Sequence, residues 1–387
     1  MSSLSIDRTN HWPIFALIIC ALATFKIQIE GLVNINLSLF EPMLAALVLR
    51  AFLRSGILVF KKTVFFAVLA ASLLVLHAFW TEPSATEFYS YWLKGYLKNL
   101  FIIFDLCGLH IVLKDLIKND KTIEGKQGLT RFLLPFYLVI GLISITLFHD
   151  EITARTIFVA NMVFLHFLNL LYRNYASRSE KYLMLALMVF ASLYVLSKVG
   201  VIVVFFLIIA DVLTSSHPTI KRYRIPAILT FFLSLILIVS LLHHLEIQGR
   251  SLDSVTRSFD VRMALWTAAL QATADTFPKG IGAGLWRPYL QVVSPVMFDE
   301  NHHYVHSTIL SYTTELGLLG ILILGGIGFL FARALLGLQR VGCAVALLAC
   351  TLPFLLLHDI QGMRMFLIAL MLGLAIDIRP SALQRSQ

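Results

Sequence analysis

The chain is poor in charged residues: Asp, Glu, Lys and Arg make up 14% of its 387 residues, against about 25% in a soluble domain. Hydrophobic residues make up 58%. This composition excludes a water-soluble globular protein. The apolar residues also fall in blocks of roughly 17–25, the length that crosses a bilayer as a helix. We therefore predict an all-α integral membrane protein with a single domain, residues 1–387.

Cysteine is also scarce, with four in the whole chain. All of them lie inside apolar segments: Cys20, Cys107, Cys343 and Cys350. That placement favours packing as small hydrophobic side chains over a disulfide framework or a metal site. The pattern of a cleavable signal peptide is not evident, because many further apolar runs follow the first one. No internal repeat is visible.

Twelve apolar runs predict about twelve transmembrane helices. They lie near residues 13–32, 37–53, 63–81, 93–113, 131–148, 155–172, 182–197, 199–214, 225–244, 307–332, 340–357 and 361–378. The first two runs are the weakest candidates, because Lys26, Glu30 and two asparagines interrupt them. The short seventh and eighth runs predict a helical hairpin with its turn at residues 197–200.

Lys and Arg gather in the loops on one side of these spans, and in membrane proteins this is the cytoplasmic side. The loops on the opposite side carry less charge. The basic side is marked by Arg50, Arg54, Lys61, Lys62, Lys114, Lys118, Lys121, Lys126, Arg131, Arg173, Arg178, Lys181, Lys221, Arg222, Arg224, Arg333, Arg340, Arg379 and Arg385. Twelve spans then place both termini in the cytoplasm. The same bias explains the net charge of +9. The sequence does not indicate nucleic-acid binding, because it has no basic stripe with interleaved aromatic residues.

One long polar loop, residues 245–305, separates the ninth and tenth spans and is periplasmic by this alternation. Loops of this length are usually functional or disordered. Trp266, Trp286 and several apolar stretches argue against disorder. Residues 258–274 predict a helix, which we expect to lie in the membrane interface.

Three cations on the outward side run against the positive-inside bias: Lys198, Arg262 and Arg287. A guanidinium offers a planar fork of donors that suits phosphate or carboxylate. These cations are candidates for clamping a lipid diphosphate, and the alternative is an interfacial anchor. The nearby stretch Gly280-Ile-Gly-Ala-Gly284 predicts a tight turn or a close approach of the backbone to a ligand.

A histidine cluster, His302-His303-Tyr304-Val305-His306, lies at the start of the tenth span. Clustered histidines alone are weak evidence for a metal, and we expect no metal and no cofactor. His306 is a candidate general base, and His303 and Tyr304 are candidates for substrate binding. Glu315 follows in the same upper membrane region, where a carboxylate is costly unless it has a partner or a function.

These residues resemble a known family. His306-Ser307, nine residues and then Gly317-Leu-Leu-Gly320 fit a pattern of bacterial O-antigen ligases, and Glu315-Leu-Gly317-Leu-Leu-Gly320 is similar to a stretch shared with O-antigen polymerases. Arg262 with residues 277–284 resembles the Arg to Pro-x-x-Gly-x-Gly segment of the same superfamily. The motifs cover about 60 residues, and the topology covers the whole chain.

The resemblance implies a membrane glycosyltransferase with a GT-C-like bundle. It implies transfer of a glycan from undecaprenyl diphosphate to lipid A-core, on the periplasmic side and without a metal or a nucleotide sugar. By the same resemblance His306 would assist the acceptor hydroxyl and Arg262 would hold the diphosphate. The family usually has arginine where this chain has Lys198, which keeps the charge but loses the bidentate fork.

Two alternatives remain. An O-antigen or exopolysaccharide polymerase would share the motifs and join two undecaprenyl-linked repeat units. A transporter or flippase would show related halves and ionisable residues near the midplane, whereas the charges here lie near the predicted helix ends.

Overall fold

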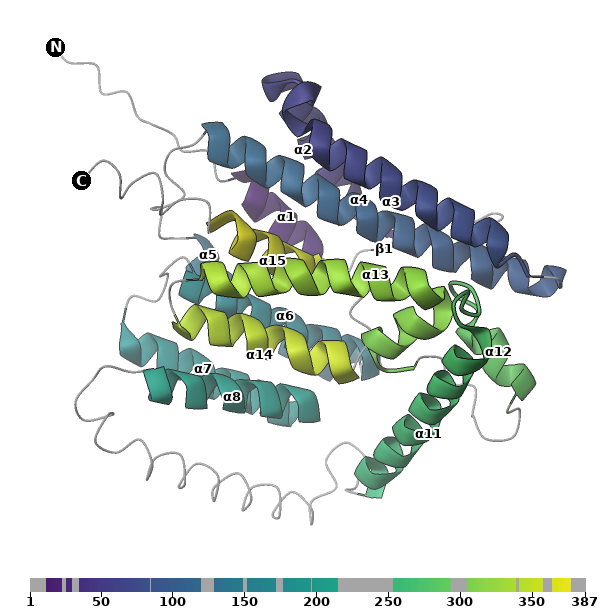
Figure 1. Ribbon diagram of the computed structural model, residues 1–387. Coiled ribbons are helices and arrows are strands. Elements are labelled where there is room, and N and C mark those ends of the chain that lie inside the picture. Colours follow the sequence, from purple (N-terminus) through teal and green to yellow (C-terminus); the bar gives the residue numbers. More distant parts are fainter. Residues whose placement is uncertain are drawn as a thin grey trace.

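The computed structural model describes residues 12–22, 26–29, 35–83, 85–119, 129–148, 152–171, 177–195, 197–214, 253–293, 305–338, 341–357 and 364–376. These residues form a helical bundle with one short β-hairpin (Figure 1). The helices are α1 (Trp12–Leu22), α2 (Phe40–Ser55), α3 (Lys61–Trp80), α4 (Tyr89–Asn119), α5 (Leu129–Phe148), α6 (Ile152–Leu171), α7 (Arg178–Tyr194), α8 (Lys198–Thr214), α11 (Asp253–Thr276), α12 (Trp286–Val293), α13 (Thr308–Gly337), α14 (Val341–Leu357) and α15 (Arg364–Ile376). The strands β1 (Lys26–Ile29) and β2 (Ile35–Ser38) pair antiparallel, with Lys26 opposite Ser38.

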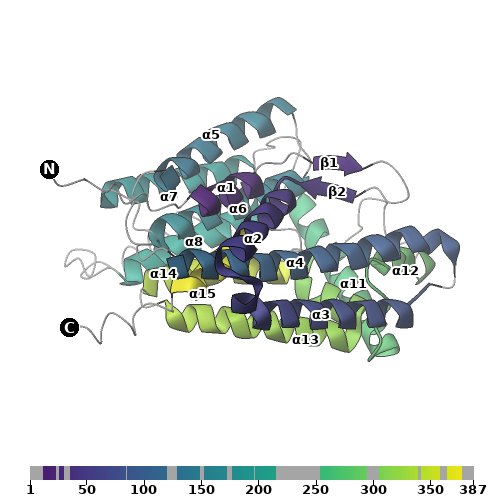
Figure 2. The same cartoon turned by 90° about the horizontal axis from the view of Figure 1, so that it is seen from above.

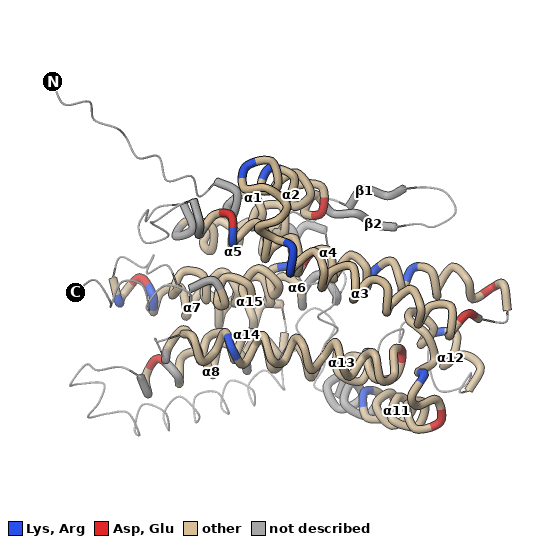
Figure 3. Tube along the Cα trace, turned by 45° about the horizontal axis from the view of Figure 1, so that its top comes forward, with Lys and Arg blue, Asp and Glu red and all other residues tan. Residues whose placement is uncertain are grey.

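Three helical segments of the described chain are long and apolar enough to cross a membrane: Ile57–Trp80, Thr86–Leu116 and Thr308–Gly337. Their outer faces carry large apolar side chains. On α3, Phe65, Phe66 and Phe79 are each more than 60% exposed. Most of the described trace is uncharged (Figure 3). Because so much apolar surface is unfavourable in water, the chain has the character of a membrane protein.

The centre of the larger core is α6. Every residue from Phe158 to Asn169 is buried, and α5, α7, α8, α14 and α15 pack around this helix. On the other side of the bundle α4 packs against α2, α3 and α15. Seen from above, α3 and α13 run side by side (Figure 2).

Ten of the twelve predicted runs coincide with a helix, from α2 to α8 and from α13 to α15. The hairpin of α7 and α8 is confirmed, because α8 begins four residues after α7 ends and the two helices pack together. Ser177 caps α7 by accepting from the Glu180 N–H at 3.1 Å, and Ser197 accepts from the Gly200 N–H at 3.1 Å at the start of α8. The helix predicted inside the long loop is confirmed as α11. The ninth run, 225–244, lies outside the described residues, as does part of loop 245–305.

The prediction for the first run, residues 13–32, was wrong. Its helix α1 has 11 residues and rises about 16 Å, roughly half of a 30 Å hydrocarbon core. The chain then enters β1. The reason is visible in Lys-Ile-Gln-Ile over 26–29, where polar and apolar residues alternate with the period of a strand.

Candidate functional site

The contact between α11 and the segment before α13 brings two predicted site residues to one place. The Trp266 indole N–H donates to the Val305 carbonyl oxygen at 3.0 Å, and Val305 directly precedes His306. Arg262 lies four residues before Trp266, so both lie on the same face of α11. Val305 is buried in an apolar cluster with Leu265 of α11. Arg262 and His306 therefore flank the same cluster.

Arg262 is partly buried. Burial lowers the pKa of its guanidinium, but an arginine remains protonated at neutral pH. Within the described residues it makes no hydrogen bond and no ion pair. A partly desolvated cation without a counter-charge is unfavourable, and an anionic ligand at this position would remove that cost.

His306 stands immediately before α13 and is fixed from both sides. Its φ of 54° is in the left-handed region, the only such value for a non-glycine residue among those described. Ser307, which is buried, caps α13 by accepting from the Leu310 N–H at 3.4 Å. Strained backbone of this kind gathers at functional sites. The position also places the imidazole beside the first turn of a helix, where the helix dipole favours negative charge.

The glycine-rich segment after α11 forms hydrogen bonds to a break in α13. At Gly317 the backbone leaves helical geometry, with φ 55° and ψ −128°. The N–H groups of Ile281 and Gly282 donate to the carbonyl oxygens of Thr314 and Glu315, each at 2.9 Å, and the Leu318 N–H donates to Pro278 at 2.9 Å. The break in α13 is thus closed by backbone bonds from residues 278–282.

Two glycines make this approach possible. A Cβ on Gly317 would lie 2.2 Å from the Pro278 carbonyl oxygen, and one on Gly280 would lie 2.6 Å from the Gly317 nitrogen. The sequence predicted either a tight turn or an approach to a ligand at 280–284. Here the close partner of Gly280 is the backbone of α13.

Threonines join α11 to α13 below this segment. The Thr314 hydroxyl lies 2.9 Å from that of Thr273 and 3.1 Å from the Ala269 carbonyl oxygen. Thr314 is fully buried. By contrast, the Thr313 hydroxyl contacts only carbonyl oxygens of its own helix.

This contrast predicts the effect of two neighbouring substitutions. Thr314→Val keeps the shape of the side chain but removes its bonds to α11, so we expect the free energy of unfolding to fall by about 1 kcal/mol. Thr313→Val is the matched control and should change it by less than about 0.5 kcal/mol. Thermal unfolding of the purified proteins in detergent measures both. Equal melting temperatures for the two variants would contradict the bonding between α11 and α13.

A buried polar group behind the glycine segment was missed by the sequence analysis. The His77 Nε2–H donates to the Lys279 carbonyl oxygen at 2.7 Å, and its Nδ1 lies 2.5 Å from the Tyr96 hydroxyl. That hydroxyl is also 2.5 Å from the Thr81 hydroxyl. These bonds attach residue 279 to α3 and α4. The available signal was a histidine inside the apolar run 63–81, since a buried polar side chain needs partners.

Arg287 lies on α12, with its guanidinium 5.9 Å from the centre of the Tyr91 ring. Its Nε is buried and has no partner within the described residues, and the same holds for the indole N–H groups of Trp92 and Trp286. Trp92 packs between Tyr89 and Tyr96 at ring distances of 5.2 and 5.3 Å. Such aromatic groups at helix ends are typical of a membrane interface.

The structure thus brings Arg262, His306, Arg287 and Glu315 to the end of the molecule where α11, α12 and the start of α13 meet (Figure 1). Lys198 is the first residue of α8, and its side chain lies outside the described part. His303 and Tyr304 also lie outside the described residues.

Comparison with protein-family models finds no match, and comparison with curated proteins finds none either.

Proposed function

We propose that the protein is an O-antigen ligase, a membrane glycosyltransferase that moves a polysaccharide from undecaprenyl diphosphate to lipid A-core at the periplasmic face of the bacterial inner membrane. The observation that carries the proposal is Arg262, a partly buried cation without a protein counter-charge among the described residues, beside the apolar cluster that also contains Val305, the neighbour of His306. A diphosphate supplies the missing negative charge.

In this proposal the acceptor hydroxyl oxygen attacks the anomeric carbon of the donor glycan. The bond from that carbon to the diphosphate oxygen breaks, and the anomeric configuration inverts. His306 accepts the hydroxyl proton, or orients the hydroxyl. Arg262 stabilises the charge that grows on the leaving diphosphate. The chemistry requires no metal and no cofactor.

The remaining candidates bind substrate around these two residues. Arg287 carries a donor N–H without a protein partner within the described chain, which suits phosphate or glycan oxygens. Lys198 adds a point charge for the donor. Glu315 is held at the break in α13 by the bond from Gly282, and His303 and Tyr304 precede His306.

We further propose that the chain is one polytopic domain, with the C-terminus in the cytoplasm and loop 245–305 in the periplasm. The charges on α3 and α13 support this orientation. Lys61 and Lys62 begin α3, and Arg333 lies near the end of α13. The candidate site lies at the opposite end of α13. In the proposed orientation the cations lie on the cytoplasmic side and the candidate site on the periplasmic side.

Deleting the gene in its host tests the function. We expect lipopolysaccharide gels to show lipid A-core without any glycan, while long chains accumulate on undecaprenyl diphosphate. A core bearing a single repeat unit would indicate a polymerase instead. An unchanged ladder would contradict both and would point to another polysaccharide or to transport.

A further inference from the structure

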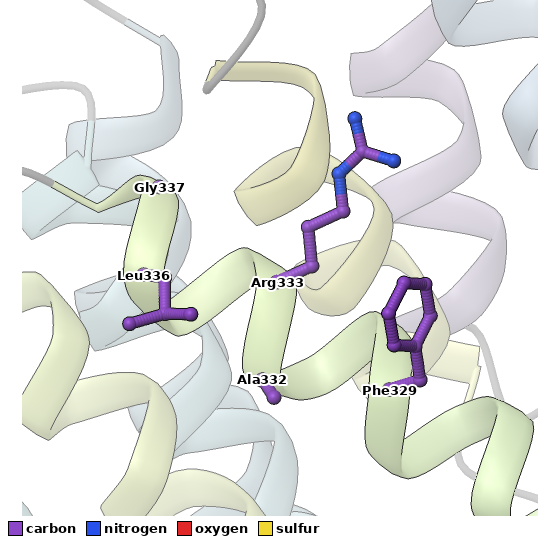
Figure 4. Close-up of a pocket in the computed structure, with 5 residues that line it drawn as sticks. All are labelled: Phe329, Ala332, Arg333, Leu336 and Gly337. Atoms are coloured by element: carbon purple, nitrogen blue, oxygen red, sulfur yellow. The ribbon is translucent and has the colours of Figure 1, made fainter.

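A cavity lies near the end of α13 that is far from the candidate site. It has a volume of about 560 Å³ and is lined by Phe329, Ala332, Arg333, Leu336 and Gly337. Arg333 is its charged residue, and Figure 4 shows its side chain extended away from α13, with the guanidinium clear of the Phe329 ring. The rest of the lining is apolar. The cavity thus combines one exposed cation with a surface that suits hydrocarbon.

Two cations lie near this end of α13. Lys114 and Arg333 both act on His110 of α4. The Lys114 ammonium donates to the Val59 carbonyl oxygen at 3.0 Å and lies 5.8 Å from the centre of the Phe60 ring, and it makes no ion pair with a residue that the structure describes. Arg333 makes no hydrogen bond and no ion pair with any residue that the structure describes. The two cations therefore present a net positive field.

The place of the cavity along α13 defines what can fill it. Thr308–Gly337 is long and apolar enough to cross a membrane, so its last two turns lie where hydrocarbon meets water. Lipids reach that level with a phosphate head and acyl chains below it. All five lining residues belong to α13. Basic residues at the cytoplasmic end of a membrane helix attract anionic headgroups, and a guanidinium fork matches phosphate better than a point charge does.

We propose that this cavity binds an acidic phospholipid. The headgroup phosphate contacts the Arg333 guanidinium within the field of Lys114, and one acyl chain lies along Phe329 and Leu336. A zwitterionic lipid is disfavoured because its own cation faces the same field. The site is separate from the residues proposed for glycan transfer and does not depend on that function.

Lipid binding to the purified full-length protein tests the proposal. Native mass spectrometry in detergent would titrate phosphatidylglycerol and phosphatidylcholine against the wild type and Arg333→Gln. We expect the variant to bind phosphatidylglycerol about fivefold more weakly, with phosphatidylcholine binding unchanged. Arg333→Lys keeps the charge and should retain most of the binding. Arg178→Gln, an exposed cation of α7, is the matched control and should bind like the wild type.

Three results would overturn the proposal. The first is equal binding of the two lipids to the wild type, and the second is equal loss in Arg333→Gln and Arg178→Gln. The third is displacement of the lipid by soluble glycerol phosphate at a similar concentration, because the site would then bind the phosphate alone, with no contribution from the acyl chain. Thermal unfolding of each variant separates a lost site from a misfolded protein.

Discussion

Replacing His306 with alanine is expected to lower glycan transfer by about 10²–10⁴-fold, the usual contribution of a general base. His306 directly precedes Ser307 and α13, and the Trp266 bond to Val305 and the Ser307 cap fix the chain on either side of it. A backbone held this way limits the positions that the imidazole can take when it meets the acceptor hydroxyl. The measurement is transfer by purified protein from an undecaprenyl-diphosphate glycan to lipid A-core, followed on a gel.

The backbone at His306 requires a second variant, because alanine tolerates a φ of 54° less well than asparagine does. His306→Asn keeps a side chain suited to that backbone but removes the basic nitrogen. We expect it to fold like the wild type and to be as inactive as alanine. Thr313→Val serves as the active control. Wild-type transfer by the asparagine variant would remove His306 from proton transfer, and lost insertion of both variants would mean a structural role.

Much of the helical architecture could be predicted from the sequence because lipid leaves few alternatives. A run of about 20 apolar residues must satisfy its backbone internally and therefore forms a helix. The runs that became α3 and α13 follow this rule. The helix α11 was also predictable, since Val261, Leu265 and Trp266 recur on one face, and Leu265 is indeed fully buried.

The first run shows where that rule fails. Hydropathy averaged over residues 13–32 hides the alternation at 26–29, and the chain forms β1 there. At residues 26–29 the alternation of polar and apolar side chains predicts the structure better than the mean hydropathy of the whole run does.

The sequence offered candidate site residues but not their arrangement. The resemblance named Arg262 and His306, and the structure shows that their chain neighbours Val261 and Val305 belong to one apolar cluster. The sequence could not show that residues 278–282 form hydrogen bonds to the broken helix at Gly317, because the hydropathy is uninterrupted across that glycine. Backbone partners far apart in sequence leave no periodic pattern.

The break at Gly317 leads to the second large expected effect. Gly317→Ala should lower the free energy of unfolding by about 3 kcal/mol or more, since an L-residue is strained at such angles. Its Cβ would also meet the Pro278 oxygen at 2.2 Å, and a backbone atom in that position has little freedom to move. Thermal unfolding in detergent gives the stability, and the transfer assay gives the function.

The same helix offers a matched control. Gly326 lies farther along α13, where an added Cβ would meet nothing within 4 Å. Gly326→Ala should leave stability unchanged or raise it by up to about 1 kcal/mol, because alanine favours helix over glycine.

Comparing the two variants distinguishes an effect of the break at Gly317 from a loss of stability that any substitution in α13 would cause. If α13 were continuous, Gly317→Ala would stabilise it as Gly326→Ala does, and the Leu318 N–H would bond within its own helix in place of Pro278. A destabilisation confined to Gly317, with transfer lost in parallel, would mean that the bonds from residues 278–282 hold Glu315 and the start of α13 in their working arrangement. Equal, small effects at both glycines would contradict the break and the backbone contacts that depend on it.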